Sequence, residues 1–126
     1  DESTPAVDAL AVRIAELGAF VPPLWYAEVT NVLLQAHKRG RITAKDVTQA
    51  LTRIRRLNVI DSPYTSDIGR LAELGMKYGL TSYDALYLDQ AVALGAALAT
   101  LDTDLRTAAS AAGVQLLPEN LKKLHT

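Results

Sequence analysis

The apolar and polar residues of this 126-residue chain follow two patterns in turn. In the longer segments, apolar side chains recur every three or four positions, which is the spacing that places them on one face of a helix. Short apolar runs bounded by Gly or Pro separate these segments and have the length of buried strands. The sequence therefore predicts helices and short strands that alternate along the chain.

Capping residues and helix breakers set the bounds of the expected elements. Thr4 with Pro5 begins the first helix and Gly18 ends it, Thr43 caps a later helix, and Thr81 with Asp84 fits a capping box. The helices are expected at about 5–17, 24–38, 44–56, 66–79, 81–94 and 103–112, and the strands at 19–22, 58–61, 97–100 and 114–117.

Strands that alternate with helices form a parallel sheet with helices on both of its faces. We therefore expect one α/β domain over residues 1–126, with three layers (α/β/α) and a short parallel sheet. In such folds, ligands bind beyond the carboxyl ends of the strands, where helix N-termini also point. This edge of the sheet is where functional side chains are expected.

Several acidic residues are expected at this edge. Asp102 and Asp104 follow the strand that ends at Thr100, and Asp84 lies in the first turn of another helix. Each also has a simpler structural interpretation: Asp84 as a capping-box acid, Asp102 as an N-cap, and Asp104 as a carboxylate favoured by the helix dipole. Their predicted convergence at one edge weakens these interpretations when they are taken together.

The long helix over 24–38 carries a narrow polar stripe. Glu28, Asn31 and Gln35 lie three and four residues apart, and apolar residues such as Trp25 and Leu34 flank them. The pattern predicts that Glu28 points into a cleft, where a carboxylate needs a cation or a hydrogen-bond donor. A structural ion pair or a bound metal would both satisfy it.

Carboxylates gathered at one site repel one another, and a divalent metal relieves that repulsion. The chain has no Cys and only two His, so its possible ligands are hard oxygen atoms that favour Mg²⁺ or Mn²⁺ over zinc. The absence of Cys also excludes disulfides and suits a reducing cytoplasm.

The segments "VPPLWYAEVTNVLLQAHKRGRIT" and "LTSYDALYLDQAVALGAALATLDTDL" resemble the PIN-domain nucleases, and in particular the VapC toxins of bacterial toxin–antitoxin pairs. The shared motifs are Glu with Asn three residues later, Tyr-Asp-Ala-x-Tyr-Leu, and Thr-x-Asp after a strand. Carried over to this chain, Glu28, Asp84 and Asp102 match three metal-binding acids, and Thr100 matches the hydroxyl residue beside the last acid. Asp104 matches a position that is often basic and would be an accessory ligand.

The resemblance implies a cytoplasmic, Mg²⁺- or Mn²⁺-dependent endoribonuclease that pairs with a cognate antitoxin and is usually a homodimer. The family's first acid lies on a first strand, shortly before the position of Asp1, and Asp1 and Glu2 do not replace it. We therefore expect the chain to be N-terminally incomplete. A catalytically incomplete PIN-like binding module is the alternative for the chain as written.

A second alternative is an aspartyl phosphatase of the haloacid-dehalogenase type, because "LATLDTDLRT" resembles its strand and Asp-x-Asp motif. That motif normally begins a much longer chain, whereas little sequence follows Asp104 here. No segment reaches the ~20 apolar residues of a membrane-spanning helix, so no membrane partner is expected.

The near-zero net charge of −1 argues against a nucleic-acid binder that works by charge alone, but it permits a local basic patch. Between 38 and 56 the only acid is Asp46. The Lys and Arg residues of this stretch are Lys38, Arg39, Arg41, Lys45, Arg53, Arg55 and Arg56. They are either a solvated helix end or a surface for RNA phosphates or an acidic antitoxin, with Lys38, Arg39 and Arg41 as candidate RNA contacts.

Overall fold

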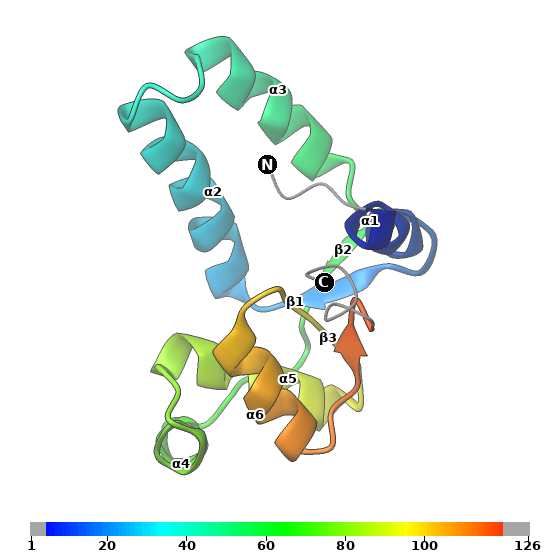
Figure 1. Cartoon of the computed structure of the whole chain (residues 1–126), viewed down its shortest axis with the longest axis vertical. Coiled ribbons are helices and arrows are strands. Elements are labelled where there is room, and N and C mark those ends of the chain that lie inside the picture. Colours follow the sequence, from blue (N-terminus) through cyan, green and yellow to red (C-terminus); the bar gives the residue numbers. More distant parts are fainter. Residues whose placement is uncertain (1–4, 120–126) are drawn as a thin grey trace. The chain divides into compact units, whose positions relative to one another are not determined.

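The computed structural model describes residues 5–119, so the expected N-cap Thr4 and the acids Asp1 and Glu2 lie outside it. The chain divides into two compact units. One is Val12–Ser62, the α2–α3 unit, and the other consists of Asp1–Ala11 and Pro63–Thr126, the α5–α6 unit. Figure 1 shows the elements of both units.

In the α2–α3 unit, the end of α1 (Pro5–Leu17) is followed by β1 (Ala19–Val21), α2 (Pro23–Lys38), α3 (Ala44–Arg55) and β2 (Val59–Asp61). β1 and β2 are parallel, with Ala19 opposite Val59. Pro22 and Pro23 end the strand because proline has no N–H to donate, and Pro23 then begins α2. Helices α2 and α3 form a hairpin (Figure 1), and neither contains a buried residue.

The α5–α6 unit contains α4 (Ile68–Tyr78), α5 (Ser82–Leu94), β3 (Leu98–Ala99), α6 (Thr103–Ala111) and β4 (Leu116–Leu117). β3 and β4 are parallel, with Leu98 opposite Leu116. The hydrophobic core lies in this unit, where α5 and α6 contact each other and α5 also contacts α4 and β3. Its buried residues are Leu74, Ala85, Leu88, Ala91, Leu98, Leu105, Ala108 and Ala109.

Local hydrogen bonds explain the helix ends. Asp67 caps α4 by accepting the N–H of Gly69 at 2.9 Å, so this helix begins two residues later than the sequence predicted. Gly79 and Gly95 end α4 and α5 with φ of 65° and 61°, a conformation that glycine adopts without steric cost. Thr43 and Asp46 form a complete capping box at α3. The Thr43 backbone N–H, bonded to the Asp46 carboxylate, lowers the pKa of Asp46.

The α/β class and the parallel pairing of the strands are confirmed, but the expected single sheet is not observed. Within residues 5–119 the strands form two separate pairs, β1 with β2 and β3 with β4. No described strand pairs with members of both. None of the helices within 5–119 is long and apolar enough to cross a membrane.

We expect Leu88→Ala to lower the free energy of unfolding by about 3 kcal/mol, because Leu88 is fully buried and truncation leaves a cavity. Urea unfolding followed by circular dichroism measures the loss. The matched control is Ile68→Ala, at a residue 84% exposed, where the change should stay within about 0.5 kcal/mol. Equal losses in the two variants would contradict the assignment of the core.

Candidate functional site

The chain beyond the carboxyl end of β3 carries Thr100, Asp102 and Asp104. Thr100 Oγ1 accepts the backbone N–H of Asp102 at 3.1 Å, and Asp102 Oδ2 accepts the N–H of Leu105 at 2.8 Å. The N-cap role of Asp102, one of the two interpretations of the sequence, is therefore confirmed. The cap occupies only one of its carboxylate oxygens.

The remaining oxygen of Asp102, Oδ1, accepts no hydrogen bond from residues 5–119. Asp102 is exposed, and Asp104 is exposed in the first turn of the same helix. Both carboxylates therefore stand at the positive end of the α6 dipole with oxygen atoms accessible to solvent. The same placement that stabilises the helix leaves acid oxygens able to bind a cation.

Asp84 occupies the corresponding place in α5. It is half-buried in the first turn, and Thr81 Oγ1 accepts its backbone N–H at 3.2 Å. α5 leads into β3 and α6 leads away from it, so both helices begin at the end of the unit where β3 finishes (Figure 1). Because α5 packs against α6, Asp84 and Asp102 lie at the starts of two neighbouring helices.

These acids can be tested against the metal that the resemblance implies. Asp84, Asp102 and Asp104 offer only carboxylate oxygens, which are the ligands that Mg²⁺ and Mn²⁺ prefer. The donor chemistry therefore fits. However, the part of the chain from 5 to 119 holds no group of three or more His, Cys, Asp and Glu arranged to bind a metal ion. The convergence of Glu28 with Asp84 and Asp102 stays a prediction.

Glu28 and Asn31 belong to the α2–α3 unit. Glu28 is half-buried, whereas Asn31 is exposed one turn later on α2. Val32 and Leu34, two of the apolar residues that flank this stripe on the helix, are 67% and 55% exposed, and the expected cleft around Glu28 stays a prediction. The only helix within its unit that has a substantial contact with α2 is α3, so part of its apolar surface is not covered there.

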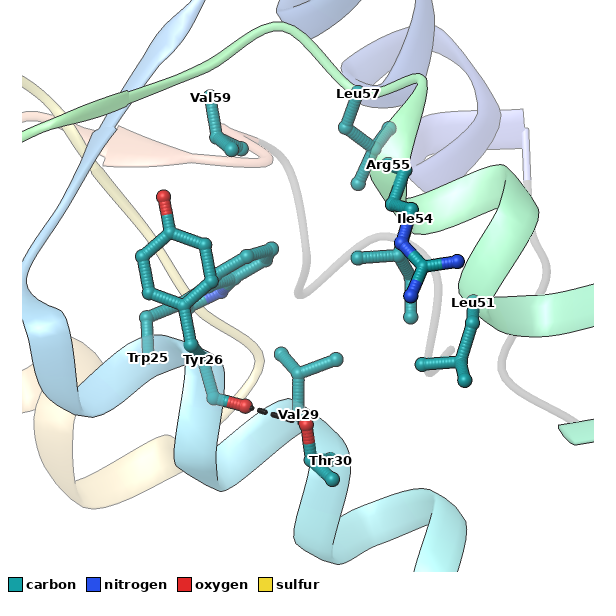
Figure 2. A pocket seen from close by; sticks show the side chains of 9 residues that line it. All are labelled: Trp25, Tyr26, Val29, Thr30, Leu51, Ile54, Arg55, Leu57 and Val59. Carbon is teal, nitrogen blue, oxygen red and sulfur yellow. Dashed lines mark hydrogen bonds between the residues drawn. The ribbon is translucent and has the colours of Figure 1, made fainter. Parts of the chain in front are cut away.

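A groove of about 440 Å³ separates α2 from α3 (Figure 2). Side chains of α2, including Trp25 and Val29, face Leu51 and Ile54 of α3 across it. Its lining residues are Trp25, Tyr26, Val29, Thr30, Leu51, Ile54, Arg55, Leu57 and Val59. Most of these side chains are apolar, and Arg55 is the one charged residue among the described residues that line the groove.

Two aromatic residues are held at the base of α2. The rings of Trp25 and Tyr26 meet edge to face, with centroids 5.2 Å apart. The Tyr26 hydroxyl donates a hydrogen bond to Asp61 Oδ1 at 2.6 Å, which ties α2 to the end of β2. This hydrogen bond to a carboxylate raises the pKa of Tyr26, because it stabilises the protonated hydroxyl.

The basic residues of the hairpin are exposed. Exposure is expected both for a solvated helix end and for a surface that binds RNA or an acidic protein. Lys38 ends α2, Arg39 is its C-cap and Arg41 follows in the turn. None of these three forms an ion pair with a described acid. The carboxylate of Asp46, the acid of this stretch, accepts the Thr43 N–H. The hairpin therefore presents positive charge to its surroundings.

Sequence reasoning missed a buried polar cluster in the α5–α6 unit. Asp89 is 2% exposed, and its Oδ1 lies 3.4 Å from Arg70 Nε. A hydrogen bond to Asp89 raises the pKa of Tyr64, and the neighbouring Gln90 donates to the Tyr64 carbonyl at 3.0 Å. The cluster fastens the segment before α4 to α5. Its only sequence signal was the polar pair Asp89–Gln90 in the mostly apolar stretch 85–94 of α5.

Arg106 was also missed. Its guanidinium donates hydrogen bonds to the backbone carbonyls of Thr100, Leu117 and Pro118. These carbonyls lie at and beyond the ends of β3 and β4, next to the candidate acids. Its four-residue spacing from Asp102 could have drawn attention, because such residues are neighbours on a helix surface.

A family model and related proteins both point to the family that the sequence motifs resemble. The family model described as "PIN domain" matches residues 2–111. The proteins named "VapC ribonuclease Mb0985" of Mycobacterium bovis and "Ribonuclease VapC9" of Mycobacterium tuberculosis are each 36% identical to the chain over 85 residues. This alignment covers 68% of the chain and 65% of each relative, so it spans slightly less than two thirds of their length.

One solved structure has a similar fold. It is the crystal structure of PAE2754 from Pyrobaculum aerophilum, with a TM-score of 0.67 over 95% of this chain and 84% of that one. The two sequences are 24% identical, so the likeness concerns the fold alone.

The two roles of Asp102 can be separated by substitution. Asn is as good an N-cap as Asp, whereas Ala cannot accept the Leu105 N–H. We expect Asp102→Asn to change the free energy of unfolding by less than about 0.5 kcal/mol and Asp102→Ala to lower it by about 1 kcal/mol. Urea unfolding of the two variants measures this difference, and equal stabilities would contradict the capping geometry.

Proposed function

Because the chain belongs to the PIN domain family, we propose that it is a metal-dependent endoribonuclease and the toxin of a toxin–antitoxin pair. The observation that carries the proposal is the placement of Asp84, Asp102 and Asp104 at the starts of two packed helices beyond the end of β3. The ribonuclease names of the Mycobacterium relatives support the same activity.

In this proposal, Asp84 and Asp102 bind Mg²⁺ or Mn²⁺, and Asp104 is an accessory ligand. Glu28 is the third principal acid, on the basis of its Glu-x-x-Asn motif, with Asn31 in a supporting role. The bound metal supplies an activated water and stabilises negative charge on the attacked phosphate. The cap of α6 uses only Oδ2 of Asp102, so Oδ1 can bind the metal.

The remaining residues orient the site and the RNA. Thr100 holds the backbone of Asp102 through its hydroxyl, so the carboxylate starts from a defined position. The N-termini of α5 and α6 favour negative charge nearby, including that of a phosphate. Lys38, Arg39 and Arg41 are exposed cations that can bind the RNA backbone.

The α2–α3 hairpin has features of a binding surface for an acidic protein, and we propose that this protein is the cognate antitoxin. Its groove is apolar, and seven Lys or Arg residues of the segment 23–56 stand against only two acids, Glu28 and Asp46. Burying apolar side chains of the partner in the groove would supply affinity, and the basic surroundings would select for acidic neighbours.

Three further features belong to the same proposal. A homodimer would cover apolar side chains that α4 and α5 expose, such as Met76 at 81% and Tyr83 at 59%. The proposed location is the cytoplasm. Membership of the PIN domain family favours a nuclease over the phosphatase alternative, because the matched residues 2–111 include both Asp84 and Asp102.

We expect Asp84→Asn and Asp102→Asn each to lower Mg²⁺-dependent RNA cleavage by the natural gene product at least about 10²-fold, because each removes a ligand charge. Cleavage of a labelled RNA, with and without EDTA, measures the effect. The matched control is Asp67→Asn, which alters another helix-capping acid and should leave cleavage unchanged. Full cleavage in both site variants would refute the assignment.

The partner proposal predicts that Ile54→Glu weakens antitoxin binding at least about tenfold, because it places an unpaired charge in the apolar groove. Thr48→Glu is the matched control, since Thr48 is exposed on the same helix and does not line the groove. Isothermal titration with the purified antitoxin measures both affinities. Equal weakening by the two variants would indicate a charge effect and not a docking groove.

A further inference from the structure

The side chain of Arg106 joins helix α6 to the ends of two strands. Its Nη1 donates to the carbonyl of Thr100 at 2.7 Å and to that of Leu117 at 3.3 Å, and its Nη2 donates to the carbonyl of Pro118 at 2.6 Å. Arg106 is half-buried, so these bonds are partly shielded from competing water. One guanidinium thus fastens the chain that leaves β3 and the chain that leaves β4.

From this geometry we propose that Arg106 is a positioning residue for Asp102, which rests on the nuclease function proposed above. The carbonyl of Thr100 is held by Arg106 only two residues before Asp102. The Asp102 carbonyl accepts the backbone N–H of Arg106 at 2.9 Å. The short connection from Thr100 to Asp102 is therefore held by Arg106 at both of its ends.

The strand pairing reinforces this arrangement. Leu117 O accepts the N–H of Thr100 at 3.1 Å as well as the Arg106 guanidinium. This is the last hydrogen bond of a parallel pair that has only two residues in each strand. So short a pair has little stability of its own, and the Arg106 side chain holds the end of the pair at Thr100 and Leu117, away from Leu98.

Arg106 acts through the backbone and not by neutralising an acid. It forms no ion pair with a carboxylate of residues 5–119. Its contacts are three carbonyl oxygens that belong to three different residues, which the planar fork of a guanidinium can reach together. A lysine ammonium keeps the charge but is a compact group on a flexible stem, so it cannot reproduce this geometry.

The experiment uses Arg106→Lys and measures amide hydrogen exchange by NMR in the absence of RNA. Two amides report on the connection: Thr100, bonded to Leu117, and Leu105, bonded to the Asp102 carboxylate. We expect both to exchange at least about tenfold faster in the variant. The Leu98 amide, bonded to Gln115 at the other end of the same strand pair, is the internal control and should not change.

The second measurement is RNA cleavage. Displacement of a catalytic acid lowers the rate of the chemical step. We therefore expect kcat to fall at least about tenfold, while KM for RNA changes by less than about threefold. Arg70→Lys is the matched control: it makes the same change at another partly exposed arginine of the unit, away from the strand ends. In this control variant, kcat and the exchange rates of the Thr100 and Leu105 amides should equal those of the wild type.

The outcomes separate the two proposals. Unchanged exchange at the Thr100 and Leu105 amides overturns the positioning role, because Arg106 then does not hold the connection. An equal acceleration at Leu98 also overturns it, because it indicates general destabilisation. Changed exchange at the two amides with an unchanged kcat also overturns it. If the wild-type protein cleaves no RNA, the nuclease proposal fails by itself, and amide exchange still decides whether Arg106 holds the connection to Asp102.

Discussion

The close packing of α5 against α6 and β3 is the constraint on which the candidate site depends. Four of the buried residues at this contact are alanines on the two helices, and Leu88 is the large side chain that is fully buried between them and their neighbours. Small side chains let helices approach closely, and dense packing then leaves little freedom in their relative placement. Since both helices begin where β3 ends, this packing also determines where Asp84 and Asp102 stand.

Structural and functional interpretations of the acids are not exclusive in this geometry. Asp102 uses one carboxylate oxygen for the cap of α6 and keeps the other available for a cation. The helix N-terminus that benefits from the cap also favours the negative charge. Arg106 holds the same connection from the other side through backbone carbonyls, so a short strand pair can carry an acid in a defined position.

The two units differ in how they use their apolar residues. The α5–α6 unit buries a cluster of apolar residues in a core, whereas the α2–α3 hairpin has no buried residue and keeps a largely apolar groove beside exposed cations. This groove is the surface that we propose as the site of interaction with the partner protein. The α5–α6 unit thus contains the hydrophobic core and three of the candidate acids, while the hairpin supplies the surface proposed to meet a charged partner.

The sequence by itself determined the order of the elements, most of their ends, and the family motifs. These features arise from contacts between residues close in the chain, such as the Thr43–Asp46 box and the glycine that ends α4. Only the tertiary structure decided that the strands form two separate pairs, because strands of two or three residues contain too little pattern to specify partners. It alone also brought Arg106 to the ends of β3 and β4 and Tyr64 to Asp89. Such contacts depend on where distant segments meet in space, and the local periodicity of the sequence does not specify which segments meet.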